Sequence, residues 1–350
     1  MPATPRILTQ RELNRALLAR QLLLERAGLP LPRALERVGG IQAQYAPSMY
    51  VGLWSRMTGL ERGALTRALE RRAVVQATLM RSTIHLVSAR DFWPFADAVR
   101  GPRRDWWQRV TRPRPTDAEM AAAAKALRGA LADGPLRRAE VELLLGKPAA
   151  RAAGMWIDLV RAPPSGTWER RRADLYARAE DWVDQPPGGE EERAAAGAER
   201  LVRRYLAAFG PASRADIARW AGVPAATIAP AVERLALRRF ASEDGDDLVD
   251  LPRAPLPPAD TEAPVRFLPT WDATLLVHVR RALVLPEAYR ARIFHTRNPQ
   301  SVPTFLVDGA VAGTWRYDAG RIDLAPFHRL DRATTRALRE EADRLAAFHA

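Results

Sequence analysis

The chain has 350 residues, of which 47% are hydrophobic, so it can bury sizeable cores and divide into roughly two to four modules. It contains no cysteine, which excludes disulfide frameworks and thiolate-bound zinc. The net charge of +13 favours polyanionic partners, and no apolar run approaches the roughly 20 residues of a membrane span. The N-terminus also lacks the apolar run of a signal peptide. We therefore expect a cytoplasmic, nucleoid-associated protein that does not bind membranes.

The positive charge comes almost wholly from arginine. Lys125 and Lys147 are the only lysines among 54 basic residues, which leaves 52 arginines. The planar guanidinium fork suits bidentate contact with phosphates, so the bias favours DNA. A GC-rich genome would also favour arginine over lysine, but it would not by itself produce the surplus of positive charge.

The first predicted unit, residues 1–115, combines helices with a hairpin. Thr9 and Glu12 form a capping-box pattern ahead of an apolar-periodic run through Leu24, which predicts the first helix. A second helix is expected from Pro32 to the Gly39-Gly40 pair. The remaining patterns are helical at 48–57 and 60–71 and extended at 74–80 and 83–87. This order is that of a winged helix-turn-helix.

A repeat predicts two further units of the same kind, at residues 116–185 and 190–251. Residues 134–141 match 210–217 at an offset of 76, and 148–150 match 224–226 at the same offset. In each copy a Gly-Pro precedes two helices and a wing. The predicted wings span 167–176 and 238–249, the second turning at Asp244-Gly245. The alternative is that short matches recur by chance in an alanine-rich chain.

The last predicted module, residues 265–350, is rich in β-structure. Proline-rich linkers at 185–189 and 252–264 set off the third unit and this module. Strands are expected at 265–268, 274–278 and 304–315, followed by a helix over 331–348. Asp308-Gly309 is a strong two-residue hairpin signal within the third strand region. The predicted fold class is thus α+β, mainly α, with tandem winged helix-turn-helix units and a β-rich C-terminal module.

Few catalytic signatures are present. There is no phosphate-binding Gly-rich loop, no His-Glu-x-x-His pair and no Gly-x-Ser-x-Gly elbow. The five histidines lack metal-ligand spacing, so we expect no metal and no cofactor. The functions that remain are hydrolysis without a cofactor and DNA binding alone.

Gln42 and Gln44, one residue apart, offer neutral amides where a hydrolase usually carries carboxylates. Alone, the pair also fits a solvated loop between two helices. However, Gln42-Ala43-Gln44 resembles the catalytic Gln-x-Gln motif of the AlkZ-like bacterial DNA glycosylases. Further segments resemble the same family in the same order, at residues 52–56, 79–87, 268–272 and 307–316. The YcaQ-like branch has Gln-x-Asp at this motif, so Gln44 places the chain closer to the AlkZ branch.

The resemblance implies tandem winged helices around a basic concave surface and excision of alkylated guanines, including bulky lesions and interstrand crosslinks. The implied partner is double-stranded DNA containing alkylated bases, bound by a monomer. An N7-alkylguanine is already cationic, so its glycosidic bond needs little acid assistance. Carbonyl oxygens of Gln42 and Gln44 could then hold a water beneath C1′ and stabilise an oxocarbenium-like transition state.

Other candidate residues have open alternatives. We expect Arg56 and Arg81 to bind backbone phosphates, and His85 to contact phosphate or lesion or to be structural. Asp272, after Trp271, either positions a neighbour or takes part in catalysis. Within the resemblance, the Asp308-Gly309 hairpin is a candidate minor-groove probe anchored by Trp315 and Arg316, with a plain sheet hairpin as the alternative.

Two other functions fit the sequence. One is a non-catalytic winged-helix DNA-binding protein such as a transcription regulator, whose recognition helix reads the major groove. The other is a different hydrolase that uses Asp272 with His85, although no recognisable spacing supports it.

Overall fold

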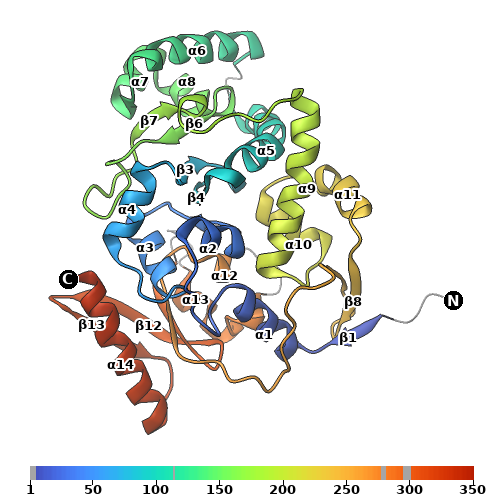
Figure 1. Ribbon diagram of the computed structural model, residues 1–350, viewed down its shortest axis with the longest axis vertical. Coiled ribbons are helices and arrows are strands. Elements are labelled where there is room, and N and C mark those ends of the chain that lie inside the picture. Colours follow the sequence, from blue (N-terminus) through green and yellow to red (C-terminus); the bar gives the residue numbers. More distant parts are fainter. Residues whose placement is uncertain (1–4, 113–114, 277–280, 295–300) are drawn as a thin grey trace.

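The computed structural model describes residues 5–112, 115–276, 281–294 and 301–350 (Figure 1). The first part of the chain forms helices followed by a hairpin, as predicted. These elements are β1 (Arg6–Leu8), α1 (Gln10–Arg20), α2 (Leu31–Val38), β2 (Ile41–Gln42), α3 (Ala46–Trp54), α4 (Arg62–Glu70), β3 (Val74–Thr78), β4 (Ile84–Ser88) and α5 (Ala89–Val110). The capping box of Thr9 and Glu12 is formed. Helix α1 ends at Arg20, four residues before Leu24, at which the helix was predicted to end. Leu22 follows with a left-handed φ of 57°.

The repeated segments are both helix-turn-helix segments. The first copy comprises α6 (Asp117–Ala130), β5 (Leu136–Arg137), α7 (Arg138–Leu145), α8 (Lys147–Ala152), β6 (Leu159–Arg161) and β7 (Leu175–Arg178). The second comprises α9 (Glu190–Phe209), α10 (Arg214–Ala221), α11 (Ala225–Arg234), β8 (Arg238–Ser242) and β9 (Asp247–Asp250). Helices α7 and α10 begin 76 positions apart, and α8 and α11 begin 78 apart. The unit boundaries themselves stay a prediction.

The two wings differ in length. The second is the short β8–β9 hairpin around Asp244-Gly245, as expected. In the first, β6 precedes the predicted span, and residues 167–171 lie in the loop between β6 and β7. Turn hydrogen bonds hold that loop, including Gly166 N–H donating to the carbonyl of Arg170 at 2.8 Å.

Strands from different predicted units pair within the same sheets. Strands β2, β4, β3, β6, β7 and β5 form one six-stranded sheet, in which β3 pairs antiparallel with β6. The first and second units therefore share a sheet. Strand β1 pairs in parallel with β8, so the start of the chain belongs to the sheet of the third unit.

The C-terminal module is a four-stranded antiparallel sheet flanked by helices. Its elements are β10 (Arg266–Leu268), α12 (Ala273–Leu276), α13 (Arg290–Ile293), β11 (Thr304–Val307), β12 (Ala310–Asp318), β13 (Arg321–Pro326) and α14 (Arg332–His349). The strand predicted at 274–278 is wrong as far as Leu276: Asp272 Oδ1 accepts from Thr274 N–H and Oγ1–H, which starts the short helix α12. His278 lies outside the described residues. Strand β13 was not expected.

The main core lies around α5 and α9, which run side by side (Figure 1). Gly197 permits this contact, because a Cβ there would lie 2.3 Å from the carbonyl oxygen of Pro94. The second unit, α6 to α8, lies at one end of the molecule and α14 at the other. None of the described helices is long and apolar enough to cross a membrane.

Candidate active site

Gln42 and Gln44 lie where a short strand leaves a glycine turn. Gly39 and Gly40 both have positive φ, at 77° and 81°, and they end α2 and lead into β2. A Cβ on Gly40 would lie 3.0 Å from Val87 Cγ1, so glycine also permits close contact with β4. Gln42 pairs with His85 across β2 and β4 and is 5% exposed, whereas Gln44 is exposed.

The side-chain carbonyls of both glutamines face fixed donors. Gln42 Oε1 accepts from Arg81 Nη2 at 3.0 Å, and Gln44 Oε1 accepts from the Ile84 backbone N–H at 3.1 Å. Arginine and backbone N–H groups only donate, so the amide oxygens, not the nitrogens, must face them. A carbonyl oxygen accepts two hydrogen bonds, and each therefore retains the capacity to accept one more.

Arg81 and His85 surround Gln42. Arg81 has a left-handed φ of 53°, and its Nη1 donates to the carbonyl of Trp220. His85 Nδ1 lies 3.0 Å from the Thr83 carbonyl and must donate to it, which leaves Nε2 as an acceptor 3.4 Å from Arg81 Nη2. Burial, together with the Arg81 charge, lowers the pKa of His85 to about 3, so its imidazole is neutral. Burial lowers the pKa of Arg81 to about 10, which leaves it cationic at neutral pH.

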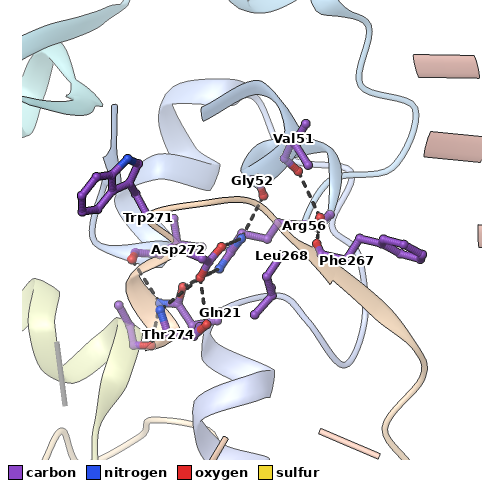
Figure 2. A network of polar contacts seen from close by, with 12 residues as sticks. Gln21, Val51, Gly52, Arg56, Phe267, Leu268, Trp271, Asp272 and Thr274 are labelled. Carbon is purple, nitrogen blue, oxygen red and sulfur yellow. Dashed lines mark hydrogen bonds and ion pairs between the residues drawn. The ribbon is translucent and has the colours of Figure 1, made fainter. Parts of the chain in front are cut away.

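Arg56 and Asp272 form a buried bidentate ion pair (Figure 2). Arg56 Nη1 and Nη2 each lie 2.9 Å from a carboxylate oxygen of Asp272, and Nη2 lies 3.3 Å from Gln21 Oε1. Arg56 is 2% exposed and Asp272 is 4% exposed. Neither side chain reaches the surface, so the pair does not favour the expected phosphate contact of Arg56, which stays a prediction, and Asp272 positions its neighbour Arg56. A hydrolase that uses Asp272 with His85 would need these two side chains to be in contact. In the described part of the chain they make no contact.

The Asp308-Gly309 hairpin forms as predicted, but its tip packs on α1. Asp308 is ion-paired with Arg11 at 2.9 Å and also with Arg15. A Cβ on Gly309 would lie 2.6 Å from Leu18 Cδ1. Gly309 is therefore buried against α1, whereas the Asp308 side chain remains 52% exposed, and a contact of this hairpin with the minor groove stays a prediction.

Trp315 and Arg316 separate into core and surface. Trp315 is 7% exposed, and its Nε1–H donates to the carbonyl of Leu268 at 3.0 Å. It is a core residue, and its expected role as an anchor of the hairpin stays a prediction. Arg316 is exposed and lies 3.4 Å from both Asp318 and Asp323, so a DNA contact there stays a prediction.

A cavity of about 300 Å³ lies beside Gln44, between the first hairpin and the second unit. Its basic residues are Arg103, Arg138, Arg151 and Arg161, and its aromatic residues are Phe92 and Tyr176. These arginines could not be predicted as site residues, since nothing in the local sequence separates them from the other arginines of the chain. Among the described residues no cluster of three or more histidine, aspartate or glutamate side chains could hold a metal ion.

Comparisons with known proteins identify the family of the chain. No curated protein matches the sequence significantly. The model of the family "DNA glycosylase AlkZ-like" matches residues 35–348, which is most of the chain. The fold is similar to that of the Streptomyces sahachiroi DNA glycosylase AlkZ, with a TM-score of 0.80, 18% identity, and coverage of 98% of this chain and 97% of that one. The chain therefore belongs to the AlkZ-like family of DNA glycosylases.

Proposed function

We propose that the protein is a monofunctional DNA glycosylase that hydrolyses the N-glycosidic bond of N7-alkylguanine-type bases in double-stranded DNA. Its range would include bulky adducts and interstrand crosslinks. It would act as a monomer without a cofactor. The observation that carries the proposal is the fixed orientation of the Gln42 and Gln44 carbonyls, each held by a donor and each retaining acceptor capacity.

The chemistry requires little acid assistance. The alkylated base carries its positive charge before the bond breaks, so it leaves as a neutral molecule without protonation. The sugar that remains develops an oxocarbenium-like charge, and a water must attack C1′, forming the C–O bond and releasing one proton to solvent. In the proposal, the free acceptor positions of Gln42 and Gln44 hold this water and direct partial negative charge at the sugar.

The surroundings suit a mechanism that uses no titrating group. His85 is neutral and donates its only N–H to Thr83, so it orients Arg81 rather than exchanging protons with a substrate. Arg81 in turn fixes the carbonyl of Gln42. We infer that Arg81 and His85 are positioning residues for the glutamine motif.

The experiment compares three duplexes, carrying N7-methylguanine, a bulky N7 adduct and an N7 crosslink. Release of the free base together with an alkali-labile abasic site in the same strand supports the proposal, and the relative rates rank the three lesions. Tight binding with no base release from any duplex would contradict it and favour a non-catalytic winged-helix regulator.

A further inference from the structure

Two buried arginines meet at the end of β3. Arg103, on α5, donates from Nη1 to the carbonyl of Thr78 at 2.8 Å. Arg161, on β6, donates from Nη2 to the hydroxyl of Thr78 at 2.9 Å. Arg103 is 6% exposed and Arg161 is 8% exposed, and both line the cavity beside Gln44. One threonine thus holds two cations at the wall of one cavity.

Among the described residues neither guanidinium forms an ion pair, although the Asp158 carboxylate acts on Arg103 from a longer distance. Arg161 Nε donates to the carbonyl of Ala173 at 3.1 Å, and its guanidinium lies 4.3 Å from the ring centroid of Tyr176. Arg103 Nε is buried without a hydrogen-bond partner. Among the described lining residues Asp158 is the one carboxylate, and it is bound to Arg100 Nη2 at 2.8 Å.

Such an arrangement costs stability in the free protein. A buried charge without an ion-pair partner is destabilising, and two like charges in one place add repulsion. Burial lowers the pKa of Arg103 to about 10, against the opposing effect of the Asp158 charge, and burial also lowers the pKa of Arg161. The arginines remain charged at neutral pH, and the one carboxylate in the described lining, Asp158, is ion-paired with Arg100.

We propose that the cavity binds one phosphodiester of the DNA backbone between Arg103 and Arg161, next to the nucleotide presented to Gln44. Guanidinium groups form charge-assisted hydrogen bonds with phosphate oxygens. The cavity of about 300 Å³ is many times larger than the space that one water needs, so it has room for a phosphate group. The position relative to the lesion rests on the proposed function.

The same charges exclude the alkylated base from this cavity. An N7-alkylguanine is a cation, and it would be repelled by the two uncompensated arginines. The phosphate and the base would therefore occupy opposite sides of Gln44. Anchoring the backbone at this point holds the sugar of the lesion against the glutamine motif.

The test scans single phosphates for binding. Duplexes carry a stable abasic-site analogue, which sets the register without requiring excision, and one phosphate at a time is replaced by a neutral methylphosphonate. For the wild type we expect one position near the analogue where replacement weakens binding about tenfold. In Arg161→Gln and in Arg103→Gln, replacement at that position should cost less than about twofold. Arg336→Gln, on the exposed face of α14, removes the same charge elsewhere and should retain the wild-type pattern.

Two further readouts separate the alternatives. The slope of log affinity against log salt should fall by about 0.9 in each cavity variant, the value for one phosphate. The melting temperature of the free protein should be unchanged or raised in Arg161→Gln, since an unpaired charge is removed; a purely structural arginine would give a fall.

A flat scan, or the same positional loss in wild type and cavity variants, would overturn the proposal. A flat scan together with stabilisation of the wild type alone by inorganic phosphate would assign the site to a free anion instead. Because these are binding measurements, a protein that shows the phosphate position but releases no alkylated base would overturn only the proposed function.

Discussion

Arg81 donates from Nη2 to Gln42 Oε1 at 3.0 Å and from Nη1 to the backbone carbonyl of Trp220. One side chain therefore connects the glutamine motif of the first unit with α10 of the third. The turn at Gly222, which ends α10, also lies against Arg81: a Cβ on Gly222 would lie 2.6 Å from the backbone nitrogen of Arg81. The position of the motif thus depends on residues more than a hundred positions away.

Gly222→Ala should slow excision by at least about tenfold, because the added methyl must displace the Arg81 backbone and small displacements at a reacting centre are costly. Gly222 has a φ of 71°, so alanine also adds about 1–2 kcal/mol of strain. Gly245→Ala is the matched control: its φ is 84°, yet no atom lies within 4 Å of an added Cβ. Single-turnover rates and urea unfolding of both variants test this. Equal rates in the two variants would show that Arg81 does not position the motif.

Gln42→Ala and Gln44→Ala should differ in stability. Gln42 is buried, and its loss leaves Arg81 Nη2 without that acceptor, so the free energy of unfolding should fall by about 1–3 kcal/mol. Gln44 is exposed, and its replacement should change stability by less than about 0.5 kcal/mol. Urea unfolding of both variants measures the difference. Equal losses would contradict the burial of Gln42.

The excision rate and the stability of the protein should depend differently on pH. Amides do not titrate and His85 stays neutral, so single-turnover excision should be nearly flat from about pH 5.5 to 8.5. Stability should not be flat. The pKa of His85 is about 3 in the folded state against 6.5 as its ordinary value, so between these the unfolded chain binds the extra proton.

Stability from His85 is therefore fully present above pH 6.5 and falls as the pH drops toward 3, by at most about 1.4 kcal/mol per pH unit. His85→Asn, which removes the titrating ring, should reduce this slope in urea unfolding between pH 4 and 6.5. An acidic limb in the rate within the flat range, or an unchanged slope in the variant, would count against this assignment.

The Arg56–Asp272 pair should behave as a buried ion pair. Arg56→Met or Asp272→Leu leaves one charge without its partner and should cost about 3–5 kcal/mol, whereas the double variant should recover much of that loss. A double-mutant cycle by urea unfolding measures the coupling. Strictly additive losses would show that the two residues do not stabilise one another. DNA affinity of the folded double variant should stay near the wild-type value, since neither residue reaches the surface.

Local signals in the sequence predicted local structure well. The Thr9–Glu12 capping box, the Gly39-Gly40 turn, the Asp308-Gly309 hairpin and the repeated helix starts are present, because each depends on residues a few positions apart. Burial was not predictable in this way. Arg56 and Arg316 look alike in sequence, yet one is buried in an ion pair and the other is exposed.

The pairing of strands that lie far apart in the sequence could not be predicted either. The cavity beside Gln44 exists because β3 pairs with β6, which brings Arg161 to Thr78 across 83 positions of sequence. No periodicity or turn signal encodes that register. The resemblance supplied the family and the Gln-x-Gln motif, whereas Arg103 and Arg161 could be found only in three dimensions.

Single-turnover excision of N7-methylguanine from a duplex at saturating enzyme tests the claim that Gln42 and Gln44 carry the chemistry. We expect Gln42→Ala and Gln44→Ala each to slow excision by roughly 10- to 1000-fold, with DNA affinity close to that of the wild type. Gln44→Ala is the cleaner variant, because its side chain is exposed and its loss should not disturb folding. Wild-type rates in both variants would contradict the claim and leave the two glutamines as part of a loop.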